Sequence, residues 1–100
     1  GGLDRSVVQA TIAKYLSQVR ACYEEGLKKK QDLEGTVNMN FEIGPEGMLN
    51  YARVARSSLN DRLVEQCISQ KMMGWKFPTP RGKMAVKVNY PFLLGPVGSG

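Results

Sequence analysis

The fold is decided by the stretch TVNMNFEIGPEG, which covers residues 36–47. Apolar and polar side chains alternate over residues 36–43, a pattern typical of a strand with one buried face. The apolar positions are Val37, Met39, Phe41 and Ile43, and the polar positions are Thr36, Asn38, Asn40 and Glu42. Residues 44–47 then read Gly-Pro-Glu-Gly, with proline second and glycine fourth, as a type I turn prefers. The stretch therefore predicts the first strand and the turn of an antiparallel hairpin.

Two further strands are predicted beside this one. The returning strand covers residues 48–57, and its imperfect alternation indicates a β-bulge near Asn50–Tyr51. The third strand is predicted at Lys83–Tyr90. In it Met84, Val86, Val88 and Tyr90 alternate with Lys83, Ala85, Lys87 and Asn89. Because Pro91 has no backbone N–H, we expect the ladder of hydrogen bonds to end there.

Two stretches have apolar residues at spacings of three and four, which indicates amphipathic helices. The first is predicted at residues 4–30, with Asp4 at its N-cap. Its apolar residues are Val8, Ile12, Tyr15, Leu16, Val19, Cys22, Tyr23 and Leu27. The second is predicted at residues 61–73, and its apolar residues are Leu63, Val64, Cys67, Ile68 and Met72.

These elements predict an α+β fold with the order α-β-β-α-β. Because the second helix carries the chain back, the simplest sheet has three antiparallel strands in the order 2-1-3. Two helices should pack on its one apolar face, with Trp75 and Phe77 closing the end of the core. An alternative for these two rings is a platform on which nucleic-acid bases stack. Strands two and three are then the edges of the sheet.

The residue inventory excludes several classes of function. The 100 residues include no histidine, so the commonest general base and metal ligand is missing. The two cysteines lack the paired spacing of a zinc site, and no glycine-rich phosphate loop is present. No run of about 18 apolar residues exists. We therefore predict a non-enzymatic domain with no catalytic residue, no cofactor and no metal.

The formal net charge of +5 lies in the last third of the sequence. Residues 1–65 sum to zero, and no acidic residue follows Glu65. The uncompensated cations are Lys71, Lys76, Arg81, Lys83 and Lys87. On the predicted topology they follow the free edge of the third strand. There they guard the edge against self-association, favour an acidic or polar partner strand, or do both. An alternative is a small basic domain that binds nucleic acid or another anionic polymer.

Five short motifs stand in the order and spacing of a TonB-like C-terminal domain, which the chain resembles over roughly residues 5–93. They are Val19–Glu24, Phe41–Gly47, Ser57–Leu59, Trp75–Pro78 and Val88–Phe92. Within that family the chain looks like the AgmX/PglI (GltJ/GltG-like) branch, which includes gliding-motility components. We expect the domain at residues 4–93, a linker remnant at residues 1–3 and a flexible tail at residues 94–100.

The resemblance implies a periplasmic module at the end of an inner-membrane-anchored protein. It implies that a proton-gradient-driven motor in the inner membrane moves the anchor, and that the domain passes the force to an outer-membrane or periplasmic partner. The third strand occupies the place where the family adds a strand of the partner. The partner-binding residues would be Lys83, Met84, Ala85, Val86, Lys87, Val88, Asn89 and Tyr90. No nucleic acid is expected as a partner, and the edge strands allow self-association.

The two cysteines lie on the apolar stripes of the two predicted helices. If both helices pack on the same face of the sheet, Cys22 and Cys67 can meet and form a disulfide. The alternative is two buried free thiols. The envelope location that the resemblance implies favours the disulfide, because that compartment is oxidising.

Overall fold

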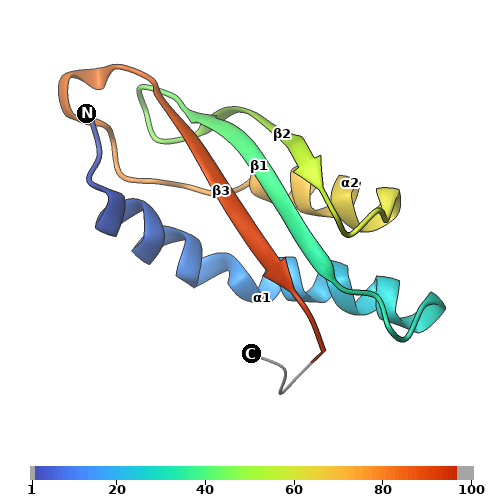
Figure 1. The fold of residues 1–100 in the computed structure, drawn as a ribbon. Coiled ribbons are helices and arrows are strands. Elements are labelled where there is room, and N and C mark those ends of the chain that lie inside the picture. Colours follow the sequence, from blue (N-terminus) through green and yellow to red (C-terminus); the bar gives the residue numbers. More distant parts are fainter. Residues whose placement is uncertain (1, 97–100) are drawn as a thin grey trace.

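The computed structural model describes residues 2–96. Its elements are, in chain order, α1 (Arg5–Lys29), β1 (Gly35–Ile43), β2 (Leu49–Ser57), α2 (Arg62–Met72), the short 3-10 helix η1 (Arg81–Lys83) and β3 (Val86–Leu94) (Figure 1). β1 lies between β2 and β3 and pairs antiparallel with both. The predicted α+β fold, with strand order 2-1-3, is confirmed.

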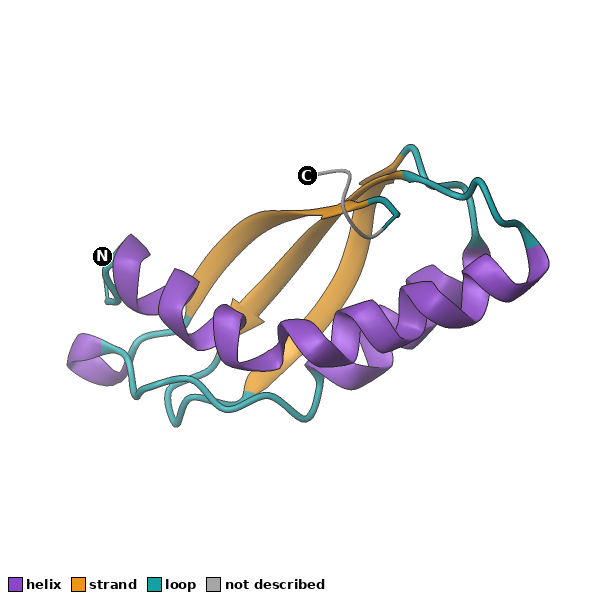
Figure 2. Ribbon diagram, turned by 90° about the horizontal axis from the view of Figure 1, so that it is seen from below, coloured by secondary structure: helices purple, strands orange, loops and turns teal. Residues whose placement is uncertain are grey.

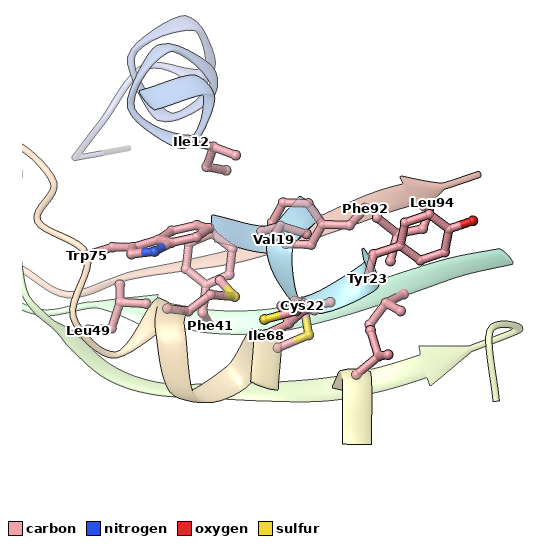
Figure 3. Packing of buried hydrophobic residues seen from close by; sticks show 14 of the residues in the cluster. Ile12, Val19, Cys22, Tyr23, Phe41, Leu49, Ile68, Trp75, Phe92 and Leu94 are labelled. Carbon is pink, nitrogen blue, oxygen red and sulfur yellow. The ribbon is translucent and has the colours of Figure 1, made fainter. Parts of the chain in front are cut away.

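Both helices lie on one side of the sheet, as predicted (Figure 2). The core lies between the helices and the sheet. β1 contributes the fully buried side chains of Val37, Met39, Phe41 and Ile43. Figure 3 shows Val19 and Tyr23 of α1 close to Phe92 and Leu94 of β3 in this layer. The central strand is therefore the most deeply buried element, and the edge strands are less covered.

The side of the sheet away from the helices is called the open face below. Residues directly opposite each other on neighbouring strands share a face, so the register assigns its members. They are Thr36, Asn38, Asn40 and Glu42 of β1, Tyr51, Arg53 and Arg56 of β2, and Lys87, Asn89, Pro91 and Leu93 of β3. No helix or strand between residues 2 and 96 covers this face (Figure 2).

The hairpin turn forms where the sequence predicts it. The Gly47 amide donates to the Gly44 carbonyl at 2.9 Å. Gly47 has a φ of 93°, and a Cβ there would overlap the Phe77 carbonyl oxygen. The Gly47 carbonyl in turn accepts a hydrogen bond from the Phe77 amide at 2.9 Å. A residue with a side chain fits neither the conformation nor the space, so glycine is required here.

β2 contains two bulges. The register with β1 shifts twice, and the extra residues are Asn50 and Ala55. The bulge at Asn50 confirms the prediction made from the alternation. The bulge at Ala55 was not predicted.

The third strand starts and ends later than predicted. It runs over Val86–Leu94 and not over Lys83–Tyr90. Lys83 belongs to η1 and has a φ of 53°, and residues 84 and 85 connect η1 to the strand. The expectation that Pro91 ends the ladder is wrong, because Pro91 pairs with Asn38 inside the strand.

Contacts with the folded part extend slightly beyond residues 4–93, the predicted bounds of the domain. Leu94 belongs to β3 and pairs with Gly35, so the folded part reaches at least this residue. At the other end Leu3 packs against the core, and the Gly2 carbonyl accepts a hydrogen bond from the Arg81 amide at 2.8 Å. Residue 1 and residues 97–100 of the expected tail lie outside the described residues.

The two helices begin in different ways. At α2 the Asp61 carboxylate accepts a hydrogen bond from the Val64 amide at 3.0 Å, which is a regular N-cap. Asp4 stands at the N-cap of α1, but its side chain caps no amide. Its carboxylate instead pairs with the Arg81 guanidinium at 3.1 Å. That pair and the Gly2–Arg81 bond tie the start of α1 to the segment that leads into β3.

A disulfide joins the two helices. Cys22 of α1 and Cys67 of α2 are bonded, with their Cα atoms 5.7 Å apart. This confirms the pairing that the family resemblance favoured over two free thiols. The bond links helices whose cysteines are 45 positions apart in the sequence.

Trp75 and Phe77 are buried, as the core prediction requires. Trp75 stacks on Tyr15 with ring centroids 4.9 Å apart, and its indole N–H donates to Gln18 Oε1 at 2.9 Å. Phe77 lies against Phe41 with centroids 5.9 Å apart. Neither Trp75 nor Phe77 is more than 1% exposed. The alternative of a base-stacking platform made of these two rings is therefore wrong.

Candidate functional site

The outer edge of β3 is the longest uninterrupted strand edge of the domain. All nine residues of β3 pair with β1, from Val86 opposite Ile43 to Leu94 opposite Gly35, without a register shift. β2 lies on the far side of β1, so no described strand pairs with the other edge of β3. A free and regular edge of this kind is a template for another strand.

The hydrogen bonds of β1 determine which backbone groups of β3 face outward. Successive residues of an antiparallel strand direct their N–H and C=O to opposite sides. The Thr36 carbonyl accepts from the Ser58 amide at 2.9 Å, and the Gly44 amide donates to the Met48 carbonyl at 2.7 Å. Both bonds point to the β2 side. Even-numbered residues of β1 therefore bond toward β2, and odd-numbered residues bond toward β3.

The same alternation applies to β3 through its register. Odd-numbered residues of β1 stand opposite even-numbered residues of β3, such as Met39 opposite Tyr90. The even-numbered residues of β3 thus bond to β1, and the odd-numbered ones direct their backbone groups to the free edge. These outward residues are Lys87, Asn89, Pro91 and Leu93. The edge offers a carbonyl at each of them, and a donor at all but Pro91.

The position of Pro91 explains why it does not end the strand. Its missing N–H would have pointed to the free edge, so the ladder with β1 loses no hydrogen bond. Proline on an exposed edge also discourages unspecific pairing, because an incoming strand finds no donor there. An added strand can therefore use the donors of Lys87 and Asn89 in full, and meets a gap at Pro91.

A groove of about 790 Å³ lies beside this edge. One wall is the start of α1 and the other is β3. The lining residues are Leu3, Arg5, Val8 and Gln9 on the helix side, and Val86–Pro91 and Leu93 on the strand side. A smaller hollow of about 360 Å³ lies further along, between Leu16, Val19 and Arg20 of α1 and Tyr90–Leu94. The space beside β3 is therefore wide enough for a further chain segment.

The predicted partner-binding residues have three different environments. Val86, Val88 and Tyr90 point to the core side and are half-buried at the floor of the groove. Lys87 and Asn89 are exposed on the open face. Lys83, Met84 and Ala85 are exposed but precede the strand, and Met84 is 72% exposed.

The prediction from the sequence did not include two parts of the candidate site. The strand continues over residues 91–94, and the helix wall of the groove comes from α1, of which Arg5 and Val8 are examples. The amphipathic spacing of α1 shows that Val8 faces inward, but it does not show that the helix leaves a gap at β3. Only the packing reveals that gap.

The cations of the last third do not gather on the β3 edge as predicted. Lys87 is the only one of the five that lies in β3. Lys71 is on α2, and the Lys76 ammonium donates to the Glu46 carbonyl at 2.8 Å. Arg81 pairs with Asp4, which lies 77 positions earlier in the sequence. The five cations are therefore spread over different elements of the fold, and of the five only Arg81 forms a salt bridge with a residue between 2 and 96.

Among residues 2–96 no three His, Cys, Asp or Glu side chains gather as metal ligands. No helix in that range is long and apolar enough to cross a membrane. The Tyr23 hydroxyl donates to the Leu33 carbonyl, and burial raises the pKa of Tyr23 above its ordinary value. This buried tyrosine holds the loop before β1 on α1, which is a structural role.

Comparisons with known proteins agree with the fold. Neither a scan of family sequence models nor a search of curated proteins finds a match to this chain. Among solved structures, the chain is similar to the NMR solution structure of the Helicobacter pylori TonB C-terminal domain, residues 179–285. The TM-score is 0.52, the sequence identity is 18%, and 96% of each chain is covered. The two domains share a fold. The resemblance to a TonB-like C-terminal domain is thus confirmed for the fold, and the AgmX/PglI branch stays a prediction.

Proposed function

We propose that this domain is a non-enzymatic protein-interaction module that binds an extended segment of its partner as a fourth strand on β3. The observation that carries the proposal is the free outer edge of β3, a strand that pairs with β1 without a register shift and lies beside a groove of about 790 Å³. In strand addition the main chain supplies the hydrogen bonds, and pockets for alternate side chains supply specificity. Both requirements are met at this edge.

The chemistry of the bound segment follows from the two sides of β3. Alternate side chains of an added strand point to the groove, where Val86, Val88 and Tyr90 offer an apolar floor. The other side chains lie next to Lys87 and Asn89 on the open face. A segment with apolar residues at every second position and polar or acidic residues between them fits this edge.

The cellular setting is part of the same proposal. The fold shared with a TonB C-terminal domain supports a place in the periplasm, at the end of a protein anchored in the inner membrane. The Cys22–Cys67 disulfide agrees with an oxidising compartment. In this setting the domain couples a proton-gradient-driven motor to an outer-envelope partner, and the resemblance to the AgmX/PglI branch points to gliding motility.

The proposal can be tested without knowing the natural partner. Nine-residue peptides, which match the length of β3, are selected from a random library on phage. In NMR titrations they should shift the amides of residues 86–93 most. The variant Asn89→Pro removes one outward donor and spares the bonds to β1. It should weaken the selected peptides about tenfold, the value of one good hydrogen bond.

The matched control places the same change on the other edge. Ala52 stands opposite Phe41, an odd-numbered residue of β1, so its amide faces the free side of β2. Ala52→Pro should leave peptide binding unchanged. Peptides that bind Asn89→Pro as tightly as the natural sequence, or shifts confined to α1 and α2, would contradict the proposal.

A further inference from the structure

A second surface of the domain, the open face, carries unpaired positive charge. The three strands contain one carboxylate, Glu42, and three cations, Arg53, Arg56 and Lys87, all of which lie on this face. Glu42 accepts a hydrogen bond from the Asn50 side chain at 2.7 Å. Arg53, Arg56 and Lys87 are exposed and form no salt bridge with any residue between 2 and 96. The face therefore has an excess of two positive charges.

The bulge at Ala55 brings the two arginines of β2 together. Residues three positions apart, such as Arg53 and Arg56, fall on opposite faces of a regular strand. The extra residue Ala55 changes the phase between them, so that Arg53 stands opposite Asn40 and Arg56 opposite Asn38 on the open face. A bulge that redirects a side chain in this way is a common feature of binding surfaces.

The first bulge has a similar effect on an aromatic ring. Leu49 and Tyr51 would share a face in a regular strand, but the extra residue Asn50 places Leu49 in the core and Tyr51 on the open face. The Arg53 guanidinium then lies over the Tyr51 ring, 4.0 Å from its centroid. This cation–π contact fixes the guanidinium in place and leaves its N–H donors free.

Amide side chains lie between these cations. Asn38 and Asn40 are neighbours on β1, and Asn89 stands opposite Asn40 on β3. None of the three side chains forms a hydrogen bond with the described residues, and the buried Asn40 Oδ1 is without any partner. Each amide can both donate and accept. Asn38 and Asn89 thus offer neutral, two-way hydrogen-bonding groups on the open face, flanked by cations.

We propose that the open face binds a carboxylated polysaccharide. Arginine pairs with carboxylates in a bidentate way, which assigns the acidic groups of the polymer to Arg53 and Arg56. Hydroxyl groups both donate and accept, which matches the unused amides of Asn38 and Asn89. An acidic peptide would also satisfy the arginines, and its backbone N–H and C=O groups can bond to the amides, so polyglutamate is included in the test below. Trp75 and Phe77 are buried and cannot stack on nucleic-acid bases, and the Tyr51 ring on the open face already has the Arg53 guanidinium over it.

The test uses polygalacturonate oligomers as the probe and calorimetry and NMR as the measurements. We expect binding that falls with salt and amide shifts on the open face of all three strands. Arg53→Gln with Arg56→Gln should weaken the binding at least about tenfold. Asn89→Ala should weaken it about threefold, because one neutral hydrogen bond is lost. Thermal unfolding of each variant checks that the fold is retained.

Two controls show whether the loss of binding comes from the open face itself. One tests the effect of net charge, and the other tests the β3 edge. Arg62→Gln with Lys71→Gln removes the same charge from α2, on the other side of the sheet, and should leave binding unchanged. The variant Arg53→Gln/Arg56→Gln should still bind the phage-selected peptides, since its β3 edge is intact.

Three outcomes would overturn the proposal. Fully methyl-esterified polygalacturonate that binds as well as the acid form would show that the carboxylates are not recognised. Polyglutamate or single-stranded DNA that binds as tightly as polygalacturonate would show attraction by charge alone. Equal binding by Arg53→Gln/Arg56→Gln and the natural sequence would place the polymer elsewhere.

Discussion

β2 and β3 flank the same central strand, but they pair with it in different ways. β2 follows β1 through two bulges, at Asn50 and Ala55, whereas β3 pairs with β1 over nine residues without a shift. α2 packs against β2, whereas a groove lies between the start of α1 and β3. The two edge strands are both nine residues long, but they differ in their bulges and in how the helices pack against them.

The difference shows how an edge strand is protected or left available. Bulges twist an edge and interrupt its row of donors and acceptors, so they discourage pairing with another chain. β2 has this protection near both of its ends, and only Tyr51–Val54 between the two bulges pair regularly with β1. On β3 the one interruption in the outward backbone is the missing donor of Pro91, near the end of the strand. We infer that β2 is the closed edge of the sheet and β3 the binding edge.

The largest expected effect comes from removing the disulfide that holds the helix layer together. Cys22→Ala with Cys67→Ala should lower the free energy of unfolding by about 4 kcal/mol, since a loop of 45 positions is released. Urea unfolding of the variant, compared with the reduced natural protein, measures this value. The double-alanine variant and the reduced natural protein should have similar free energies of unfolding, both lower than that of the disulfide-bonded protein.

The same variant tests whether helix cover keeps β2 closed. α1 and α2 share the disulfide, and α2 packs against β2. Amide exchange should therefore become faster in β2. The exchange rates of the outward amides of β3 should change little, because no strand covers them in the natural protein. Unchanged stability, or acceleration in β3 alone, would mean that the helices do not set the difference between the edges.

A smaller effect is expected when the unpredicted bulge is removed. Deletion of Ala55 makes this part of β2 regular and should cost no more than about 1 kcal/mol of stability. Because the row of outward donors is then regular from Tyr51 to the end of the strand, the variant should self-associate at lower concentration than the natural protein. Sedimentation velocity measures this.

Pro91→Ala is the corresponding change on β3. It restores the one missing outward donor and should raise self-association through that edge in the same assay. If Ala55 deletion and Pro91→Ala both leave the association constant unchanged, bulges and proline are not what protects these edges.

The sequence predicts the central features of the fold because their signals are local. The alternation at residues 36–43 and the Gly-Pro-Glu-Gly turn need no information from elsewhere in the chain. The bulge at Asn50 was predictable because Leu49 and Val54 are apolar and must both reach the core. The bulge at Ala55 lies before the polar Arg56 and Ser57, so no apolar residue conflicts with regular alternation there.

The parts that sequence reasoning missed depend on distant residues. Pro91 continues a strand because its missing N–H faces away from β1, and this depends on the register with Asn38. Asp4 pairs with Arg81 instead of capping its own helix. The groove exists because α1 leaves space next to β3. The spacing of apolar residues within α1 does not predict this space.

Amide hydrogen exchange along β3 tests the central claim most directly. In the free protein the outward amides of Lys87, Asn89 and Leu93 should exchange quickly, and those of Val88, Tyr90 and Phe92 slowly. A bound peptide should slow the three outward amides and leave those of Ala52 and Val54 on β2 unchanged. Uniformly slow exchange along β3 in the free protein, or protection by the peptide on β2, would contradict a binding edge on β3.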